Sequence, residues 1–276
     1  MRVKISDDFD LMKIVDSGQC FRPKKIENGS VRFISGKNFV YIKRIDEDIF
    51  DVNCTPEEWN GFWKNYFDLE TNYSEIRRKI YDFAAGRKCG NFLKEVTDCG
   101  AGIRILKQEP FEMLLSFIIS QRKSIPSIRS SVEKISNFFG REVETPYEKI
   151  RLFPAPEDFS AGCANLEKCG LAYRQNYLED AIKRVLSCEL DLEKISNLPD
   201  DELLTELQKI KGVGMKVANC VALFAYHRVD CAPVDVWIKR AIDEDFDGEN
   251  IFEKFGKYAG ILQQYVFFGK RTLAGK

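Results

Sequence analysis

The sequence predicts an α+β fold, in which an antiparallel β-rich N-terminal part is docked on a helical C-terminal part. Short runs of β-branched and aromatic residues, separated by turn residues, fill the stretch 31–52, as is typical of an antiparallel meander. From about residue 66 onward the apolar residues recur at helical spacing instead. No internal repeat, low-complexity tract or long Pro/Gly/Ser linker separates the two parts, so we expect them to pack against each other.

The composition excludes several classes of protein. The 276 residues are 44% hydrophobic and 31% charged, which suits one large or two ordinary domains. No apolar run is long enough to span a membrane, and the N-terminus lacks the apolar segment of a signal peptide, so we expect an intracellular protein that does not bind membranes. The nine cysteines are scattered without a C-x-x-C pair, which argues against a disulfide framework and a zinc site.

The net charge of −1 gives no global support for nucleic-acid binding. A compact footprint can still be locally positive where basic residues converge. The single histidine, His227, argues against His-based triads and His-rich metal sites. The basic residues that could converge are Arg122, Lys123, Arg174, Lys209, Lys211 and Lys216.

The β-rich part contains three expected strands with turn residues between them. The segment Ser17-Gly18-Gln19-Cys20-Phe21-Arg22 precedes them, and its spacing alone favours a simple turn at Gly18. The helical part begins with amphipathic and aromatic segments, followed by a mostly apolar helix that we expect to be buried. We expect strands at 31–34, 39–45 and 49–52, and helices at 56–67, 73–83, 111–121, 176–187, 236–242 and 251–270.

Two glycines, Gly212 and Gly214, separate two apolar helical patterns and predict a helix-hairpin-helix at about 199–226. Glycines allow positive φ and close backbone approach, and the second helix begins with free N–H groups. Such a helix start can bind a phosphate without basic side chains. An αα-hairpin in which the glycines only make the turn explains the same spacing.

Three reactive side chains follow the hairpin. Lys216 falls in the first turn of the second helix, where the positive end of the helix dipole favours a neutral, nucleophilic amine. Cys220 lies one turn further along the same face. Asp235 precedes a short expected helix, whose N–H groups favour its ionised carboxylate. Taken singly, Lys216 is explained as a solvated helix residue and Asp235 as a helix cap.

The run Lys211-Gly212-Val213-Gly214-Met215-Lys216-Val217-Ala218-Asn219-Cys220, followed by Pro233-Val234-Asp235-Val236, resembles the helix-hairpin-helix Gly/Pro-Asp superfamily of DNA glycosylases. Within it, the chain is most similar to a bacterial or archaeal 8-oxoguanine DNA glycosylase, over most of its length. The resemblance implies an N-terminal antiparallel domain related to half of the TATA-binding protein at 1–98, and an all-helical glycosylase domain at 99–276.

The resemblance also implies a bifunctional enzyme, which flips 8-oxoguanine out of duplex DNA and excises it. Lys216 would form a Schiff base with the sugar, Asp235 would offset the developing positive charge, and β-elimination would cleave the strand. We expect no cofactor and no catalytic metal, although the carbonyls of Gln208, Ile210 and Val213 could hold a structural monovalent cation. The expected partner is double-stranded DNA containing 8-oxoguanine.

The sequence carries no signal for the oligomeric state, so a monomer is the default expectation. We expect the protein in the cytoplasm, associated with the nucleoid in a prokaryote, or in the nucleus of a eukaryote.

Four residues match the family's positions for the lesion base. The carbonyl of Gly18 would accept a hydrogen bond from N7–H of 8-oxoguanine, whereas guanine presents a lone pair at N7. Opposed buried acceptors cost about 1–3 kcal/mol, which would separate the two bases. Gln263 would read the Watson–Crick edge, and Phe267 and Cys220 would cover the two faces of the purine. Taken alone, Phe267 is an ordinary core residue.

Other matches concern the DNA duplex. Tyr173 would wedge between base pairs and Arg174 would fill the space left by the extruded base, which helps offset the cost of unstacking. Gly212 and Gly214 would receive a phosphate.

The chain departs from the family at two of these places. Eukaryotic members have a run of asparagines followed by an arginine that reads the opposing cytosine, so the preference for cytosine is left open here, where the matching positions are Arg122, Lys123, Ser124 and Ser127. A solvated helix end explains Arg122 equally well. Trp237 replaces a phosphate-contacting histidine and offers only an uncharged N–H.

Two alternatives remain. A monofunctional alkylpurine DNA glycosylase of the same superfamily would use Asp235 alone, and Lys216 speaks against it. A non-catalytic helix-hairpin-helix module would only bind DNA, and the presence of Asp235 and Tyr173 at their family spacings disfavours that reading.

Overall fold

The β-branched runs form a five-stranded antiparallel sheet in the computed structural model, which describes residues 1–274. The strand order is β1-β5-β4-β3-β2, so the predicted meander is confirmed and gains a strand at each edge. Gly36, at φ +55°, makes the tight turn that fixes the register of β3 against β4. The strands are β1 (Arg2–Lys4), β2 (Lys24–Lys25), β3 (Val31–Ser35), β4 (Asn38–Arg44) and β5 (Ile49–Val52).

One face of this sheet is covered by helical segments, which bury the first hydrophobic core. Phe33 of β3 packs edge-on against Phe67, with ring centroids 5.1 Å apart, and Trp63 lies beside the same ring. The covering segments are α1 (Leu11–Asp16) and a continuous helical run made of α2 (Pro56–Glu58), the π-helical turn η1 (Trp59–Trp63) and α3 (Lys64–Tyr66). The sequence predicted that run as one helix at 56–67, and its extent is confirmed.

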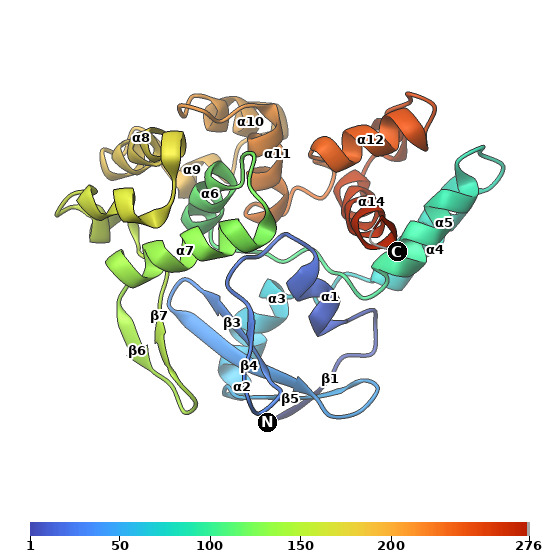
Figure 1. Cartoon of the computed structure of the whole chain (residues 1–276). Coiled ribbons are helices and arrows are strands. Elements are labelled where there is room, and N and C mark those ends of the chain that lie inside the picture. Colours follow the sequence, from blue (N-terminus) through green and yellow to red (C-terminus); the bar gives the residue numbers. More distant parts are fainter. Residues whose placement is uncertain (275–276) are drawn as a thin grey trace.

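The second, larger core belongs to the helical part, which lies above the sheet in Figure 1. The predicted helix at 251–270 is interrupted, because Gly256 ends the first piece at φ +73°. No helix among residues 1–274 is long and apolar enough to cross a membrane. The helices are α4 (Tyr73–Ala84), α5 (Gly90–Gly100), α6 (Pro110–Ile119), α7 (Ile125–Phe139), α8 (Gln175–Leu186), α9 (Leu192–Ile195), α10 (Asp200–Gln208), α11 (Met215–Phe224), α12 (Val236–Glu244), α13 (Ile251–Phe255) and α14 (Ala259–Leu273), with 3-10 turns η2 (Pro156–Phe159), η3 (Ala164–Cys169) and η4 (Ala172–Arg174).

The two cores divide the chain near residue 70. Helix α5 packs against α4 and α14, and the buried Ile80 of α4 and Leu93 of α5 join the core of the helical part. Conversely, Leu106 belongs to the core under the sheet. The domain boundary between 98 and 99 remains a prediction, but the hydrophobic core of the helical part already begins at Tyr73.

A β-hairpin that the sequence did not predict follows α7. Its strands, β6 (Glu142–Glu144) and β7 (Lys149–Arg151), extend down beside the main sheet in Figure 1. Ile150 packs on Ile34 of β3, and the hydroxyl groups of Tyr41 and Thr145 lie 2.8 Å apart. The hairpin therefore ties the helical part to the sheet.

Arg104 is the buried link between the two parts. It lies in the segment between α5 and α6, and its guanidinium forms an ion pair with Asp7 at 3.1 Å. Its remaining donors satisfy main-chain carbonyls of the N-terminal part, as a buried charge requires. Those carbonyls belong to Asp8, Phe67, Asp68 and Thr71.

Candidate active site

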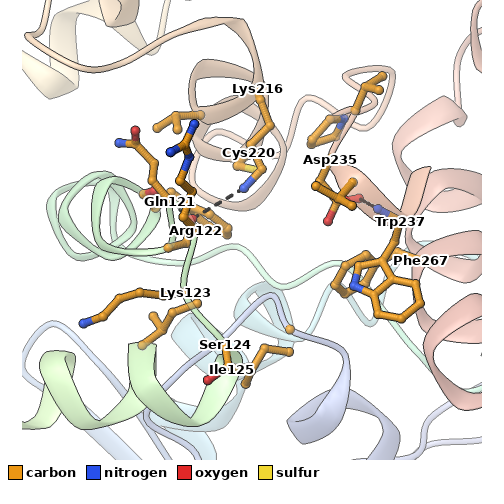
Figure 2. Close-up of a pocket in the computed structure, with 18 of the residues that line it drawn as sticks. Gln121, Arg122, Lys123, Ser124, Ile125, Lys216, Cys220, Asp235, Trp237 and Phe267 are labelled. Atoms are coloured by element: carbon orange, nitrogen blue, oxygen red, sulfur yellow. Dashed lines mark hydrogen bonds between the residues drawn. The ribbon is translucent and has the colours of Figure 1, made fainter. Parts of the chain in front are cut away.

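A cavity of about 900 Å³ opens between α11, α12, α14 and the segment that leads into α7. This volume suits a nucleotide-sized ligand. Figure 2 shows side chains of α11 on one side of the space and those of α12 and α14 on the other. Most of the site residues predicted from the sequence line it, namely Gly18, Arg122, Gly212, Gly214, Lys216, Cys220, Asp235, Trp237, Gln263 and Phe267.

The predicted helix-hairpin-helix is confirmed as α10, a tight turn and α11. Gly212 has φ +79°, and a Cβ atom there would lie 2.3 Å from the ring of Tyr177, so this glycine faces the protein. Gly214 is the N-cap of α11, receives no side-chain cap, and has open space where a Cβ would be. The free N–H groups of α11 can therefore be approached over Gly214.

Lys216 lies in the first turn of α11 and reaches into the cavity. Its Nζ donates a hydrogen bond to the Ser120 hydroxyl at 3.4 Å and lies 5.7 Å from the centre of the Phe117 ring. Ser120 donates its own proton to the Phe117 carbonyl at 2.8 Å, so its lone pairs are free to accept from the lysine. Ser120 was not predicted, because nothing in its local sequence distinguishes it from a helix-end serine.

Cys220 lies one turn after Lys216, and both residues line the cavity as the sequence predicted. The cysteine is only 4% exposed. Burial raises the pKa of its thiol, and the neighbouring Lys216 charge opposes part of that rise. The wall beside the amine is therefore formed by a neutral thiol.

Asp235 is the N-cap of α12, as predicted. Its Oδ1 accepts hydrogen bonds from the backbone N–H groups of Trp237 and Ile238, both at 2.9 Å. Figure 2 shows the side chain across the cavity from Lys216 and Cys220. The carboxylate thus caps the helix and also borders the cavity, so the two readings of Asp235 are compatible.

Gly18 lies at the far end of the cavity, in a backbone conformation and a close approach that favour glycine. Its φ is +82°, and a Cβ would lie 3.0 Å from Cε1 of Phe267 and 3.2 Å from Cδ1 of Ile125. Its neighbours are fixed from two directions. The Ser17 carbonyl accepts a 2.6 Å hydrogen bond from the side chain of Gln264, a residue that the sequence did not single out.

Gln19 fixes the other side of Gly18. Its amide is fully buried, donates to the Arg104 carbonyl at 2.8 Å and accepts from the Leu106 N–H at 2.8 Å. Its main-chain carbonyl accepts from the side chain of Gln108 at 2.9 Å. The backbone around Gly18 is therefore held rigidly by the segment that joins the two parts of the molecule.

Gln263 and Phe267 project from α14 into the same end of the cavity. Gln263 is 4% exposed, and its buried Oε1 has no hydrogen-bond partner within residues 1–274. Buried amide oxygens are normally paired, so this one is poised for a ligand. Phe267 is half-buried, and the guanidinium of Arg271 lies 5.1 Å from its ring centre. Arg271 also lines the cavity and was not predicted.

The cavity is locally positive despite the net charge of −1. Of the six charged side chains that line it, five are basic and one is Asp235. Arg122 is exposed at its rim, and Trp237 is half-buried with Arg240 5.4 Å from its ring. The basic lining residues are Arg122, Lys123, Lys216, Lys239 and Arg271.

Tyr173 and Arg174 lie outside the cavity lining. Tyr173 is 48% exposed, as suits a residue that reaches into a duplex. Arg174 is only 5% exposed, and its guanidinium donates to main-chain carbonyls of Gln121 and Leu171. Its role at the duplex stays a prediction.

The suggested cation site lies on the hairpin between α10 and α11. The Ile210 carbonyl accepts a hydrogen bond from the Val213 N–H at 3.0 Å, as the turn requires. The carbonyls of Gln208, Ile210 and Val213 stay a prediction as cation ligands.

Comparisons with known proteins agree with this geometry. A family model described as "8-oxoguanine DNA glycosylase, N-terminal domain" matches residues 2–114. A probable N-glycosylase/DNA lyase of Methanothermobacter thermautotrophicus is 28% identical, over 97% of this chain and 95% of the relative.

Among solved structures, MBOgg1 with a low affinity DNA ligand is 32% identical with a TM-score of 0.92, over 100% of this chain and 96% of that one. The 8-oxoguanine glycosylase/lyase of Clostridium acetobutylicum, in complex with double-stranded DNA containing cytosine opposite 8-oxoguanine, is 34% identical with a TM-score of 0.89, over 99% and 98% of the two chains.

Proposed function

The chain belongs to the 8-oxoguanine DNA glycosylase family, and on that premise we propose that Lys216 and Asp235 are its catalytic residues. Its activity is that of a bifunctional DNA N-glycosylase with AP lyase activity in the repair of 8-oxoguanine. One observation carries the proposal: the amine and the carboxylate border the same cavity, whose far end holds Gly18 and the unpartnered amide oxygen of Gln263.

Lys216 is the nucleophile in this mechanism. A flipped nucleotide in the cavity would bring C1′ of its sugar to Nζ, and a bond from nitrogen to C1′ would form as the bond to the base breaks. The base leaves with the bonding electron pair and takes up a proton. After loss of a proton from nitrogen and opening of the sugar ring, the Schiff base allows β-elimination of the 3′ phosphate.

Asp235 acts electrostatically. Its charge faces the cavity across from Lys216, where it can offset the positive charge that develops on the sugar. The two N–H donors of α12 hold the carboxylate in place, so it needs no reorganisation during the reaction.

The far end of the cavity selects the base. Gln263 supplies an amide for the Watson–Crick edge, while Phe267 and Cys220 cover the two faces of the purine. Gly18 would distinguish N7–H of 8-oxoguanine from the N7 lone pair of guanine. The substrate would be duplex DNA with 8-oxoguanine, bound by a monomer in the cytoplasm, at the nucleoid of a prokaryote, or in the nucleus of a eukaryote.

Borohydride trapping tests this proposal. Duplexes with 8-oxoguanine opposite each of the four bases, and with unmodified guanine, are incubated with the wild-type protein and with Lys216→Gln. We expect a covalent adduct with the lesion only, which Lys216→Gln abolishes while it still binds DNA. Lys194→Gln, an exposed lysine of α9 outside the cavity, serves as the matched control and keeps the adduct.

The other outcomes separate the alternatives. An unaltered adduct in Lys216→Gln would rule out this lysine as the nucleophile. Base release without an adduct would favour a monofunctional enzyme that relies on Asp235. Adduct yields across the four duplexes measure how strictly the base opposite the lesion is read.

A further inference from the structure

We propose that two buried glutamines, Gln264 and Gln108, are positioning residues that hold the loop of Gly18 in register with the rest of the site. In doing so they set the preference for 8-oxoguanine over guanine. This inference rests on the proposed function, in which the Gly18 carbonyl reads N7–H of the lesion. Each glutamine acts through the main chain on one side of Gly18.

The site is assembled from both parts of the molecule. Gly18 follows α1 in the N-terminal part (Figure 1). Lys216 lies on α11, and Gln263 and Phe267 lie on α14, both in the helical part. A carbonyl that reads one atom of a base must be held to within about 0.5 Å of its productive position. The register between the loop and the two helices therefore has to be fixed by contacts between the two parts.

Gln264 ties the loop to α14. Its side chain is buried, with the residue only 2% exposed, and Nε2 donates a 2.6 Å hydrogen bond to the Ser17 carbonyl. The preceding residue on the helix is Gln263, whose amide would read the Watson–Crick edge of the base. The two groups that would read the base, the Gly18 carbonyl and the Gln263 amide, are thus each one residue away from the same hydrogen bond.

Gln108 ties the loop to α11. This residue is also buried, and its side-chain amide donates to the Gln19 carbonyl at 2.9 Å. Its own main-chain N–H donates to the carbonyl of Phe224, the last residue of α11, at 3.0 Å. One residue therefore joins the loop of Gly18 to the helix that carries Lys216.

The pattern of hydrogen bonds around Gly18 supports this role. The carbonyls of Ser17 and Gln19 each accept from a buried amide, while the Gly18 carbonyl between them accepts no hydrogen bond within residues 1–274. Glycine has no Cβ to restrict its backbone, so the restraint has to come from its neighbours. Loss of either amide would leave a buried carbonyl unpaired, a cost that the loop can relieve by shifting.

Separate assays of base excision and strand cleavage test the proposal. Gln264→Met and Gln108→Met keep the length of the side chain and remove the amide. Each should slow single-turnover excision of 8-oxoguanine roughly tenfold or more, as expected when a buried carbonyl loses its donor. Cleavage of a duplex with a preformed abasic site requires Lys216 but no base, so its rate should be unchanged.

DNA binding gives a second readout, which a general loss of stability would not change. In a Lys216→Gln background, discrimination is measured as the ratio of the dissociation constants for duplexes with guanine and with 8-oxoguanine. Each glutamine variant should lower this ratio severalfold, by weakening the binding of the lesion duplex and leaving that of the guanine duplex unchanged.

A double-mutant cycle tests whether the glutamines act through Gly18. Gln264→Met should slow excision little further when it is added to Gly18→Ala, because the loop position that it protects is already lost. Thr97→Val is the matched control. It removes a fully buried hydroxyl that donates to the Leu93 carbonyl at 2.6 Å in α5, outside the cavity, and should leave excision and discrimination unchanged.

A parallel fall in excision and abasic-site cleavage, an unchanged ratio of dissociation constants, or additive effects in the cycle would overturn the inference. Where thermal unfolding shows that Gln108→Met is not folded at the assay temperature, Gln264→Met, on a different element, decides alone. Wild-type excision and borohydride trapping are measured alongside. Absence of both would reject the proposed function, while the ratio of dissociation constants would still decide the role of the glutamines.

Discussion

At the scale of single residues, the end of the cavity that would receive the base contains a position at which any side chain is strained. Gly18 combines a positive φ with a close approach to Phe267 and Ile125. Its neighbours Ser17 and Gln19 are fixed by hydrogen bonds from Gln264 and to the Arg104–Leu106 segment. Selection between two bases that differ at N7 requires such rigidity, because a mobile carbonyl could turn away from the wrong base.

Gly18→Ala tests this position. The added Cβ must displace the Phe267 ring, so we expect excision of 8-oxoguanine to fall roughly ten- to a hundredfold, as for a lost buried hydrogen bond of about 1–3 kcal/mol. Gly29→Ala is the matched control, since φ there is +84° and its Cβ would meet only the Lys43 side chain at 3.6 Å. Both variants should lose about 1–2 kcal/mol of unfolding free energy. Equal excision rates in the two would contradict a role for Gly18 in the pocket.

Sequence reasoning found the residues that carry their own local signal. Lys216, Asp235 and Gly18 stand in recognisable runs, and all three line the cavity. The residues that support them have no such signal. Ser120 and Gln264 act through contacts with residues 96 and 247 positions away in the chain, and neither contact can be read from a local pattern.

At the scale of secondary-structure elements, α12 has its N-terminus built into the site. The carboxylate that caps this helix also borders the cavity. Capping and charge can be separated experimentally, because asparagine caps helices about as well as aspartate but is neutral.

Asp235→Asn should therefore change the free energy of unfolding by less than about 0.5 kcal/mol. Excision should fall by about a hundredfold or more, in the range seen when a group that stabilises transition-state charge is removed. Asp191→Asn is the control, since Asp191 caps α9 in the same way, with donors at 3.0 and 2.9 Å, outside the cavity. A stable Asp235→Asn protein with full activity would limit Asp235 to capping.

The meander and the hairpin helices were predicted closely, whereas the helices α5 and α7 and several short elements were not predicted. The strands of the meander and the two helices of the hairpin follow alternation and helical spacing over their whole length. Strand β1 has three residues and exists only because it pairs with β5, almost 50 residues later. The break at Gly256 was missed because the apolar pattern continues across it.

At the scale of the whole molecule, the stability of the fold should depend on a buried acid in α6. Glu112 is 5% exposed, and burial raises its pKa to about 8, with Arg22 opposing and Glu109 adding to the shift. The folded state therefore keeps this proton between about pH 4.5 and pH 8, while the unfolded state loses it. Because the folded state binds more protons in this window, stability falls as pH rises.

The contribution of Glu112 should approach a loss of about 1.4 kcal/mol per pH unit within that window. In Glu112→Gln the free energy of unfolding should fall less steeply with pH, by this amount. This variant should be more stable than the wild type above pH 8. Urea unfolding at several pH values measures the difference. Glu167→Gln, at an exposed position, should keep the wild-type slope. A wild-type slope in Glu112→Gln would mean that this carboxyl ionises freely in the folded protein.

The two-core arrangement itself was only partly predictable. The composition and the change from alternating to helical spacing of apolar residues indicated a β-rich part followed by helices. The predicted α+β fold class is confirmed. The assignment of α5 to the helical core depends on its packing against α14, more than 150 residues later in the chain, and α4 packs on α5. Packing between such distant segments leaves no trace in local periodicity.

The burial of Cys220 bears on how long this enzyme survives in a cell under oxidative stress. Peroxide attacks thiolates, and attack on a pocket cysteine would place a sulfenic acid against the incoming base. Burial raises the pKa of this thiol, so the sulfur stays protonated and unreactive at neutral pH. If Cys220 covers the base as proposed, a protonated thiol at that place is a poor target for the oxidants that create 8-oxoguanine.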